Sequence, residues 1–455
     1  MRERFIVIGG DAAGMSAASK ARRKNPELEI IALEKGDWAS YAACGLPYYL
    51  KGNVDNIEDL IAIPPEVFRE KRDIDLRLNH EVTKIIPEKK KIVVKSPSNE
   101  TEFNYNKLLI STGARVARPR IEGIDSQGVF FLRGMSDGIK IREYLEKREP
   151  KSVLIVGGGY IGLEMAEAFH ARGMSVSIVE LLPHLLSTFS PEIVEIVERD
   201  VKDYARLYLG RRVNSIREID KDKLSVSISD GENKNQEEIE TAIVLIATGI
   251  IPETSLARDT GIKLGKSGAI ITDEYGETNI SAIYAAGDCT EVKSVVTGQN
   301  IYLPLALTAN RNGRAVGTTI AGEKTLLSPI AGTAVVKVFQ LEVAITGLTD
   351  LDAAKEYGFN PAKVTIDSHS RAGYCPGAKP IKISLIADRD SKRILGSSMV
   401  GEEGVSKRID IIATALYSRI TVQELENLDL AYAPPFSPVW DPVLTAARVL
   451  NGRLK

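Results

Sequence analysis

The hydropathy pattern begins with a short apolar run, Phe5–Ile8, followed by a glycine-rich turn and a helical stretch from Met15 to Lys24. A second apolar run, Leu28–Leu33, ends at Glu34. Continuous apolar runs are typical of strands buried on both faces of a parallel sheet. The pattern predicts a βαβ unit in which the start of the helix faces a phosphate and the acid can bond ribose hydroxyls.

The same pattern returns in the middle of the chain. Val153–Val156 precedes a second glycine-rich turn, a helical stretch runs from Leu163 to Gly173, and the strand Val176–Val179 ends at Glu180. A second βαβ unit of this kind predicts a second bound dinucleotide. We expect one to be FAD and the other a nicotinamide nucleotide; two coincidental glycine turns are the alternative.

The two turns differ at one glycine. In the first turn, Asp11 takes the place of the second glycine of the dinucleotide-binding fingerprint, whereas the second turn has all three glycines, at Gly157, Gly159 and Gly162. A glycine there allows the backbone to approach the pyrophosphate closely. We therefore expect the first turn to make that approach differently.

Each unit is followed by an apolar strand that ends on small residues, Leu108–Ala114 and Ile243–Gly249, and Ile283–Asp288 later delivers a carboxylate just past a glycine. Small residues let the backbone pack closely against a nucleotide. The order of these strands predicts that the second fold is inserted into the first. The expected domains are a discontinuous FAD domain at 1–115 and 248–325 and a nicotinamide domain at 116–247.

From about Ile330 the pattern changes to alternating strands, with helices from about Ser406. Because proline fixes φ and removes an N–H, we expect Ala431–Phe436 to be stiff and extended. The whole chain is thus predicted to be α/β, with two Rossmann-like domains and a C-terminal α+β domain at 326–455. The strands expected in the last domain are Thr333–Phe339, Leu341–Thr346, Ile381–Ala387 and Ile394–Met399.

The composition is that of a globular chain of about three domains, with 455 residues, 44% of them hydrophobic and 26% charged. A net charge of -2 creates no field that would attract nucleic acid or an anionic membrane. The chain runs from Met1 almost directly into an apolar strand, and no apolar run is long enough to span a bilayer. We expect a cytoplasmic protein. The scattered histidines lack metal-ligand spacing, so no metal site is predicted.

The candidate chemistry centres on Cys44, which follows the first βαβ unit and has no cysteine nearby. Cys289 and Cys375 lie far along the chain and are interpreted as structural, although Cys375 beside Tyr374 is a candidate for the active site of a partner subunit. We expect any disulfide of Cys44 to use a sulfur from outside the chain. The alternative is a buried cysteine that acts as a small hydrophobe.

These motifs together resemble the pyridine nucleotide-disulfide oxidoreductase superfamily over the whole chain. The lone Cys44, with Ser40 and Pro47 around it, resembles the single-cysteine branch, which contains coenzyme A disulfide reductases, NADH oxidases and NADH peroxidases. The oxidase and peroxidase have a histidine where this chain has Ala12, which favours the reductases. Ala43 departs from the asparagine that often precedes the cysteine in the family.

The resemblance implies a homodimer whose active site is shared between subunits. Tyr374 and Tyr432 match two tyrosines that the C-terminal domain of the partner presents to the cysteine. On the first helix, basic and hydroxyl residues match positions that contact coenzyme A; a solvated helix end is the alternative. The implied coenzyme A contacts are Ser16, Lys20, Arg23 and Ser40.

The resemblance also assigns cofactor contacts. Tyr160 matches a residue that gates the flavin, and Glu164 an acid that supports the flavin pocket. The FAD contacts are Gly9, Gly10, Ala13, Gly14, Glu34, Lys35, Val82, Thr112, Gly113, Asp288, Pro304 and Ala306. The nicotinamide nucleotide and the flavin gate involve Gly157, Gly159, Tyr160, Ile161, Gly162, Glu164, Glu180 and Gly249.

The implied reaction is the NADH-dependent reduction of coenzyme A disulfide, or of coenzyme A persulfide or polysulfide, through a Cys44–S–S–CoA mixed disulfide. Glu180 repels a 2′-phosphate, and Leu181 and Leu182 offer no arginine for it, so we expect NADH, with NADPH as the alternative. The flavin and the tyrosine donors are expected to lower the pKa of Cys44. Two other functions remain open: an NADH oxidase that works through a Cys44 sulfenic acid, and a flavoprotein electron carrier of the ferredoxin reductase kind.

Overall fold

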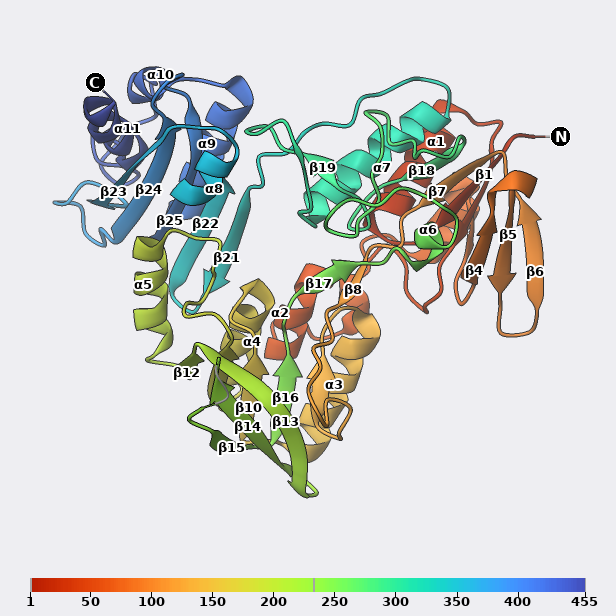
Figure 1. Ribbon diagram of the computed structural model, residues 1–455, viewed down its shortest axis with the longest axis horizontal. Helices are drawn as coiled ribbons and strands as arrows, with labels where there is room; N and C mark the ends of the chain where they lie inside the picture. The colour runs from red at the N-terminus through yellow and green to blue at the C-terminus, as the bar shows by residue number, and fades with distance from the viewer. Residues whose placement is uncertain (1, 232–233, 455) are drawn as a thin grey trace.

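The computed structural model describes residues 2–231 and 234–454. It has three lobes, each built around its own five-stranded sheet (Figure 1). The N-terminal and C-terminal lobes lie at the top of the view, and the middle part of the chain forms the lobe below and between them. The short helix α2 (Leu46–Lys51), which follows Cys44, packs against α4 (Tyr160–Ala171) where the lobes come together.

The sheet of the N-terminal lobe is parallel, in the order β18-β7-β1-β2-β3. Phe5 and Val7 on the central strand are fully buried. The last strand to join, β18, is separated from β7 in sequence by the whole middle lobe. The strands are β1 (Arg4–Ile8), β2 (Glu29–Leu33), β3 (Asp75–Arg77), β7 (Lys107–Ile110) and β18 (Ile283–Ala285).

Two helices of this lobe approach each other through glycines. A Cβ on Gly313 would lie 2.2 Å from the Ala13 carbonyl oxygen, and a Cβ on Gly317 would lie 2.3 Å from that of Ala17. No other residue fits at such a distance, so these glycines fix the helix that follows the first turn. The helices are α1 (Ala12–Lys24) and α7 (Ala306–Ile320); α6 (Ser255–Arg258), β19 (Val292–Lys293) and β20 (Asn300–Ile301) also belong to this part.

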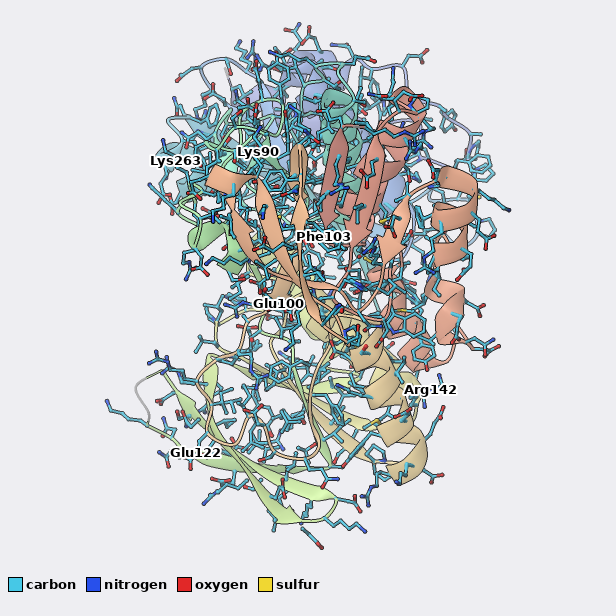
Figure 2. All side chains as sticks on the ribbon, turned by 90° about the vertical axis from the view of Figure 1, so that its right-hand side faces the viewer. Lys90, Glu100, Phe103, Glu122, Arg142 and Lys263 are labelled. Carbon is cyan, nitrogen blue, oxygen red and sulfur yellow. The ribbon has the colours of Figure 1, made fainter. Side chains whose placement is uncertain are left out.

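An antiparallel three-stranded sheet covers one side of the N-terminal lobe. It consists of β4 (Glu81–Ile86), β5 (Lys91–Lys95) and β6 (Glu100–Asn104). Figure 2 faces this sheet, which Lys90, Glu100 and Phe103 mark. Its buried residues, Ile92 and Val94 among them, extend the core of the parallel sheet.

The middle lobe repeats the first arrangement. Its sheet is parallel, in the order β12-β11-β10-β16-β9, with α3 (Met135–Arg148), marked by Arg142 in Figure 2, and α4 packed beside it. A second, antiparallel sheet adds β13 (Arg211–Asp220), β14 (Lys223–Asp230) and β15 (Glu237–Thr241). The parallel strands are β9 (Val129–Phe131), β10 (Ser152–Val156), β11 (Ser175–Glu180), β12 (Ala205–Leu209) and β16 (Ile243–Ile246).

The chain passes between these two lobes twice, on neighbouring strands. On the way out it forms β8 (Ala114–Val116), and on the way back β17 (Ile250–Pro252). The two pair antiparallel, with Val116 opposite Ile250 and Ala114 opposite Pro252. The connection between the lobes is therefore a two-stranded ribbon.

The C-terminal lobe has an antiparallel sheet in the order β21-β22-β25-β24-β23. Helix α5 (Pro191–Val201) of the middle lobe reaches β24 and β25 of this sheet. The strands are β21 (Ala334–Val338), β22 (Leu341–Gly347), β23 (Pro361–His369), β24 (Pro380–Asp388) and β25 (Ile394–Gly401). The helices are α8 (Leu351–Glu356), α9 (Val405–Ser418), α10 (Val422–Glu426) and α11 (Pro442–Arg453).

The predicted α/β class is confirmed, with two parallel Rossmann-like sheets and a separate C-terminal lobe. The domain boundaries stay predictions. Both nucleotide helices begin three residues earlier than expected, at Ala12 and Tyr160, because the end of each glycine turn already has helical geometry. Among the described residues, no helix combines the length and the apolar character needed to cross a bilayer.

The expectation of an extended proline-rich segment is wrong for its second half. The carbonyl oxygen of Ala433 accepts hydrogen bonds from the N–H groups of Phe436 and Ser437, so the chain turns at this point. Pro434 and Pro435 fit this turn because proline has a fixed φ. Neither has an N–H, so the carbonyl oxygen of Ala433 accepts from the N–H groups that follow them. The turn places Phe436 on the surface, where its side chain is 78% exposed.

Candidate functional site

The first glycine turn closes tightly over the end of β1. Gly9 has a φ of +103°, and a Cβ there would lie 2.2 Å from the Ser111 carbonyl oxygen. A Cβ on Gly14 would lie 2.0 Å from the carbonyl oxygen of Gly9. Glycine is therefore required at both positions, and the closed turn leaves the first N–H groups of α1 at the end of the sheet.

Glu34 and Glu180, the two acids predicted to bond ribose, have equivalent positions in the two parallel sheets. The carboxylate of Glu34 accepts hydrogen bonds from the N–H groups of Gly10 and Gly36, both at 2.8 Å. The carboxylate of Glu180 accepts from Gly158 at 2.6 Å and from Leu182 at 2.8 Å. Each acid is thus fixed beside its own glycine turn, at the strand end where Rossmann folds bind the ribose.

Asp11, which replaces a fingerprint glycine, forms a hydrogen bond with the backbone of a neighbouring segment. Its carboxylate accepts a hydrogen bond of 3.2 Å from the N–H of Tyr41, on the segment that leads to Cys44. Burial raises the pKa of Asp11 to about 6, against the effect of this hydrogen bond. The residue that breaks the fingerprint therefore links the phosphate turn to the cysteine segment.

Further residues near the first glycine turn come from parts that lie far along the chain: a Cβ on Gly287 would lie 2.8 Å from the Cβ of Ala13. Asp288 follows β18, and Gly113, with a φ of +70°, follows β7. The buried hydroxyl of Tyr302 has no hydrogen-bond partner among the described residues, and the carboxylate of Asp288 acts on it. An unpartnered buried hydroxyl and tightly closed glycine turns fit a polar dinucleotide such as FAD in this site.

Cys44 lies in a single helical turn, Ala43–Gly45, immediately before α2, and its side chain is exposed. Within this chain its pKa is raised, because neighbouring protein reduces the solvation of the thiol and because the carboxylate of Glu164 lies nearby. Arg133 acts in the opposite direction, and Asp288 adds to the rise. The expected lowering of this pKa is thus not found in the single chain; it stays a prediction for the dimer with its flavin.

Tyr160 and Glu164 share one face of α4, one turn apart. The ring of Tyr160 lies 6.0 Å from that of Phe189 between centroids, and burial raises the pKa of its hydroxyl to about 12. Burial, and then Glu167, raise the pKa of Glu164 to about 7. Glu164 also lines a depression together with Tyr48 of α2 and residues of β21 and β22. An acid that gains and loses its proton near neutral pH therefore lies close to Cys44.

The two predicted tyrosines come together on the C-terminal lobe. The N–H of Ala372 donates to the Pro434 carbonyl oxygen at 3.1 Å, which joins their loops, and a hydrogen bond to Tyr432 raises the pKa of Tyr374. Their side chains are 77% (Tyr374) and 45% (Tyr432) exposed. Neither is among the described residues with the largest effects on the pKa of Cys44 within the same chain.

The predicted coenzyme A contacts follow the outer face of α1. Ser16 donates to the side-chain oxygen of Asn310 at 2.7 Å, Lys20 is half-buried, and Arg23 is exposed. Ser40 has a φ of +51° and lies beside the phosphate turn, where its N–H donates to the Gly10 carbonyl oxygen at 2.9 Å. A surface with hydroxyl and basic side chains therefore adjoins the cysteine segment.

The remaining predicted contacts occupy varied environments. Thr112 bonds the carbonyl oxygen of Glu253 at 2.6 Å, and Gly249 has a φ of +97° at the end of β16. Ala13, Val82 and Gly162 are buried, Lys35 and Ala306 are exposed, and Pro304 and Ile161 are half-buried. Their contacts with a cofactor stay predictions. Among the described residues, no group of three His, Cys, Asp or Glu side chains is arranged to hold a metal ion.

Two residues of this site were missed by the sequence reasoning. Tyr302 carries the unpartnered hydroxyl, and Arg133 forms an ion pair of 3.0 Å with Asp288. Neither belongs to a glycine turn or to a strand end in the fingerprint. The only signal for Arg133 is its place between an apolar strand and the start of a helix.

The chain belongs to the pyridine nucleotide-disulphide oxidoreductase family. The model of that family matches residues 3–312, and the model of its dimerisation domain matches residues 333–442. The predicted recognition is confirmed. This family uses FAD together with NAD(P)H, and its C-terminal domain forms dimers.

Similar proteins indicate the branch of the family to which the chain belongs. The chain is 40% identical over 452 residues to an NAD(P)H sulfur oxidoreductase (CoA-dependent) of Pyrococcus abyssi, covering 99% of each chain. It is 31% identical to a coenzyme A disulfide reductase of Staphylococcus haemolyticus, covering 95% of this chain and 96% of that protein. It is 36% identical to a protein of Methanocaldococcus jannaschii named NADH oxidase, covering 98% of each chain.

Solved structures agree with this placement. Reduced CoADR-RHD of Bacillus anthracis superposes with a TM-score of 0.95 at 35% identity, covering 100% of this chain and 81% of that one. An NAD-dependent persulfide reductase of A. fulgidus superposes with a TM-score of 0.93 at 36% identity, covering 99% of this chain and 83% of that one. The chain is therefore an oxidoreductase of the branch that includes coenzyme A disulfide and persulfide reductases.

Proposed function

We propose that the protein is an NAD(P)H-dependent reductase of coenzyme A disulfide, or of the related persulfide and polysulfide. The observation that carries this proposal is the exposed Cys44, which follows the FAD site without a second cysteine beside it. Cys289 is fully buried, and Cys375 lies on the C-terminal lobe. A disulfide at Cys44 therefore takes its second sulfur from a substrate.

The covalent step is a thiol–disulfide exchange. The Cys44 thiolate attacks one sulfur of coenzyme A disulfide, forms Cys44–S–S–CoA, and releases the other coenzyme A as a thiolate. FAD held at the first glycine turn, beside Gly9, Gly14 and Glu34, would supply the two electrons from NAD(P)H that reduce this mixed disulfide to coenzyme A thiolate and Cys44 thiolate. Because the pKa of Glu164 is about 7, only part of its population is charged at neutral pH, which limits the negative charge near the sulfur.

The proposed binding of coenzyme A is supported by the charged surface of α1. Lys20 and Arg23 carry positive charge on the helix that begins at the FAD turn, and Ser40 lies on the segment leading to the cysteine. Coenzyme A combines a thiol with several phosphates, so it needs cations at a distance from the reacting sulfur. These residues are the proposed phosphate contacts.

We infer further that a second subunit completes the site. Tyr374 and Tyr432 are exposed, are linked by a side-chain hydrogen bond, and lie on the dimerisation domain. In a dimer they would donate hydroxyl protons to the sulfur atoms at Cys44 of the other chain. A tyrosine that is exposed in one subunit can be buried at the interface with a second subunit, where its hydroxyl finds a hydrogen-bond partner.

The nucleotide preference is proposed to favour NADH. The Glu180 carboxylate is held by two backbone N–H groups at the end of β11, so it does not turn away easily from a ribose. A fixed carboxylate repels a 2′-phosphate, and Leu181 and Leu182, both exposed, offer no positive charge in its place.

The intact mass of the purified, unreduced protein tests the proposed function. The expected result is a coenzyme A adduct on Cys44 that dithiothreitol removes, together with NADH-dependent release of coenzyme A from its disulfide. A sulfenic acid at Cys44, with rapid NADH-dependent oxygen consumption, would instead support an NADH oxidase. That second candidate is favoured by the relative named NADH oxidase, whereas Ala12 in the glycine turn speaks against it.

A further inference from the structure

Arg133 is held at a fixed point between two elements of the middle lobe. It lies between β9 and α3, and its N–H donates to the Asp137 carboxylate at 2.9 Å. The next N–H, of Gly134, donates to the same carboxylate at 3.1 Å. Because Asp137 caps the start of a 14-residue helix in this way, the backbone of Arg133 cannot move independently of α3.

The side chain of Arg133 leaves its own lobe. Its Nε donates to the carbonyl oxygen of Ala114 at 3.0 Å, and its terminal nitrogen donates to the Asp288 carboxylate at 3.0 Å. Both partners border the FAD site: Ala114 follows Gly113, and Asp288 follows β18. The rigid fork of a guanidinium can hold two such acceptors at once, which an ammonium group holds less well.

The site that Arg133 enters is rich in negative charge. Asp11, Glu34 and Asp288 surround the first glycine turn, and the pyrophosphate of a bound dinucleotide adds two more charges. Arg133 is the cation that acts on the titration of Asp11, Tyr41 and Tyr302. A single charge-assisted pair in a partly buried site is worth more than one in water.

The same cation lies beside the segment that leads to Cys44: a Cβ on Gly134, next to Arg133, would lie 3.1 Å from the Tyr41 hydroxyl oxygen. The charged groups that act on Cys44 come from three elements: Glu164 from α4, Asp288 from the strand end after β18, and Arg133 from the start of α3. Tyr48 of α2 is the further titratable neighbour. Two of these groups are acids that disfavour a thiolate, and Arg133 is the cation among them that favours it.

The lysines near α2 are engaged elsewhere. Lys51 and Lys337 both bond the carboxylate of Glu167, at 2.7 and 3.2 Å. They balance Glu167, and Lys51 also acts on Tyr48 beside Cys44. Among the groups of the described residues with the largest effect on the sulfur, Arg133 is the cation.

We propose that Arg133 is a positioning residue of the reduction, which fixes Asp288 for the flavin and supplies the positive charge that faces Cys44. The proposal rests on the proposed function, since it assigns Arg133 to the same flavin and cysteine. Arg133 belongs to the middle lobe, which is proposed to bind the nicotinamide nucleotide. Through this residue the middle lobe contributes to the environment of Cys44 in the N-terminal lobe.

The test compares the wild-type holoenzyme with Arg133→Gln, Arg133→Lys and the control Arg148→Gln. Arg148 lies on the same helix and pairs with Asp222 at 3.3 Å, within the middle lobe. The first readout is the rate of FAD loss after dilution, followed by flavin fluorescence. The second is the rate at which iodoacetamide alkylates Cys44 between pH 5 and 10, after dithiothreitol has freed the thiol and has been removed by desalting, with peptide mass spectrometry to separate Cys44 from Cys375. No disulfide substrate is used, so failure of the proposed substrate does not affect the result.

For Arg133→Gln we expect FAD loss to be faster by about tenfold and the midpoint of the alkylation profile to rise by about one pH unit. Arg133→Lys should lose FAD faster as well but keep a midpoint close to wild type, because it keeps the charge and loses the fork. Arg148→Gln should match wild type in both readouts.

Unchanged FAD loss in either Arg133 variant would overturn the positioning role. A midpoint in Arg133→Lys as high as in Arg133→Gln would overturn the electrostatic one. If Arg133→Gln does not fold, Arg133→Lys decides alone: FAD loss above the wild-type rate with a wild-type midpoint supports the proposal, and any other pair of results rejects it.

Discussion

The carboxylate of Glu167 lies 2.7 Å from the ammonium of Lys51, and this pair joins α4 to the helix that follows Cys44. The same carboxylate accepts from Lys337 at 3.2 Å and from the N–H of Phe339 at 3.0 Å, both in the C-terminal lobe. Three lobes therefore meet at one acid, which is largely buried. Next to it, the rings of Tyr204 and Phe339 stack with centroids 4.1 Å apart.

Replacing Glu167 by glutamine should loosen this junction. The variant loses two ion pairs but keeps a hydrogen-bond acceptor, and we expect the free energy of unfolding to fall by about 1–2 kcal/mol. Urea denaturation followed by tryptophan fluorescence measures it. Glu240→Gln is the control, because Glu240 pairs with Lys223 on an exposed face and should cost less than about 0.5 kcal/mol. Equal losses in the two variants would contradict a special role for Glu167.

Cys44→Ser should abolish disulfide reduction while FAD stays bound. Serine is a poor nucleophile toward sulfur, and we expect NADH-dependent coenzyme A release to fall by at least about a thousandfold. Cys375→Ser is the matched control and should keep wild-type turnover, because Cys375 is interpreted as structural. Undiminished disulfide reduction by Cys44→Ser would rule out the mechanism, and a strong loss in Cys375→Ser would show that the C-terminal sulfur takes part.

Mixing two inactive variants tests whether the site is shared. A Cys44→Ser chain keeps its tyrosines, and a Tyr374→Phe, Tyr432→Phe chain keeps its cysteine. In a mixed dimer, one of the two shared sites contains both the cysteine and the tyrosines. After co-refolding of equal amounts, we expect about a quarter of wild-type activity, since half the dimers are mixed and half of their sites are complete. No recovery would place the tyrosines and the cysteine of one site on the same chain.

The pH dependence of stability should reveal Glu164. Because its pKa is raised in the folded chain to about 7, the folded form keeps a proton that the unfolded form releases. Stability therefore falls as the pH rises from about 4.5 to about 7, and Glu164→Gln lacks this fall. We expect the variant to gain on the order of 2 kcal/mol relative to wild type between pH 5 and pH 8, measured by urea denaturation. Glu195→Gln, exposed on α5, should follow the wild-type curve. Parallel curves for Glu164→Gln and wild type would contradict the raised pKa.

The repeated local pattern explains how much of the fold was predictable. Apolar runs such as Phe5–Ile8 and Val153–Val156 are buried on both faces, so their hydropathy alone identifies central parallel strands. The return of the first sheet at β18 followed from the order of the small-residue turns. Strand β23 was missed, because Pro361–His369 lies at the edge of its sheet and mixes buried with exposed residues.

The candidate site divides in the same way. The positions of Glu34 and Glu180 beside the glycine turns were predictable, because each acid follows its turn and strand at a fixed distance in sequence; their contacts with ribose stay predictions. The role of Arg133 follows from a contact with Asp288, a residue that lies far away in the chain. No local pattern encodes such a contact, since it depends on how two lobes are placed relative to each other.

The ribbon of β8 and β17 has one more consequence. Ala114 and Pro252 face each other across it, so the entry and the exit of the middle lobe are neighbours. A segment whose two ends meet can be removed, exchanged or inserted elsewhere with only a short link to close the gap. Glu180, which is proposed to set the nucleotide preference, lies on this exchangeable segment together with Arg133 and Glu164. Exchanging the segment would therefore alter the donor site and the charges around Cys44 at the same time.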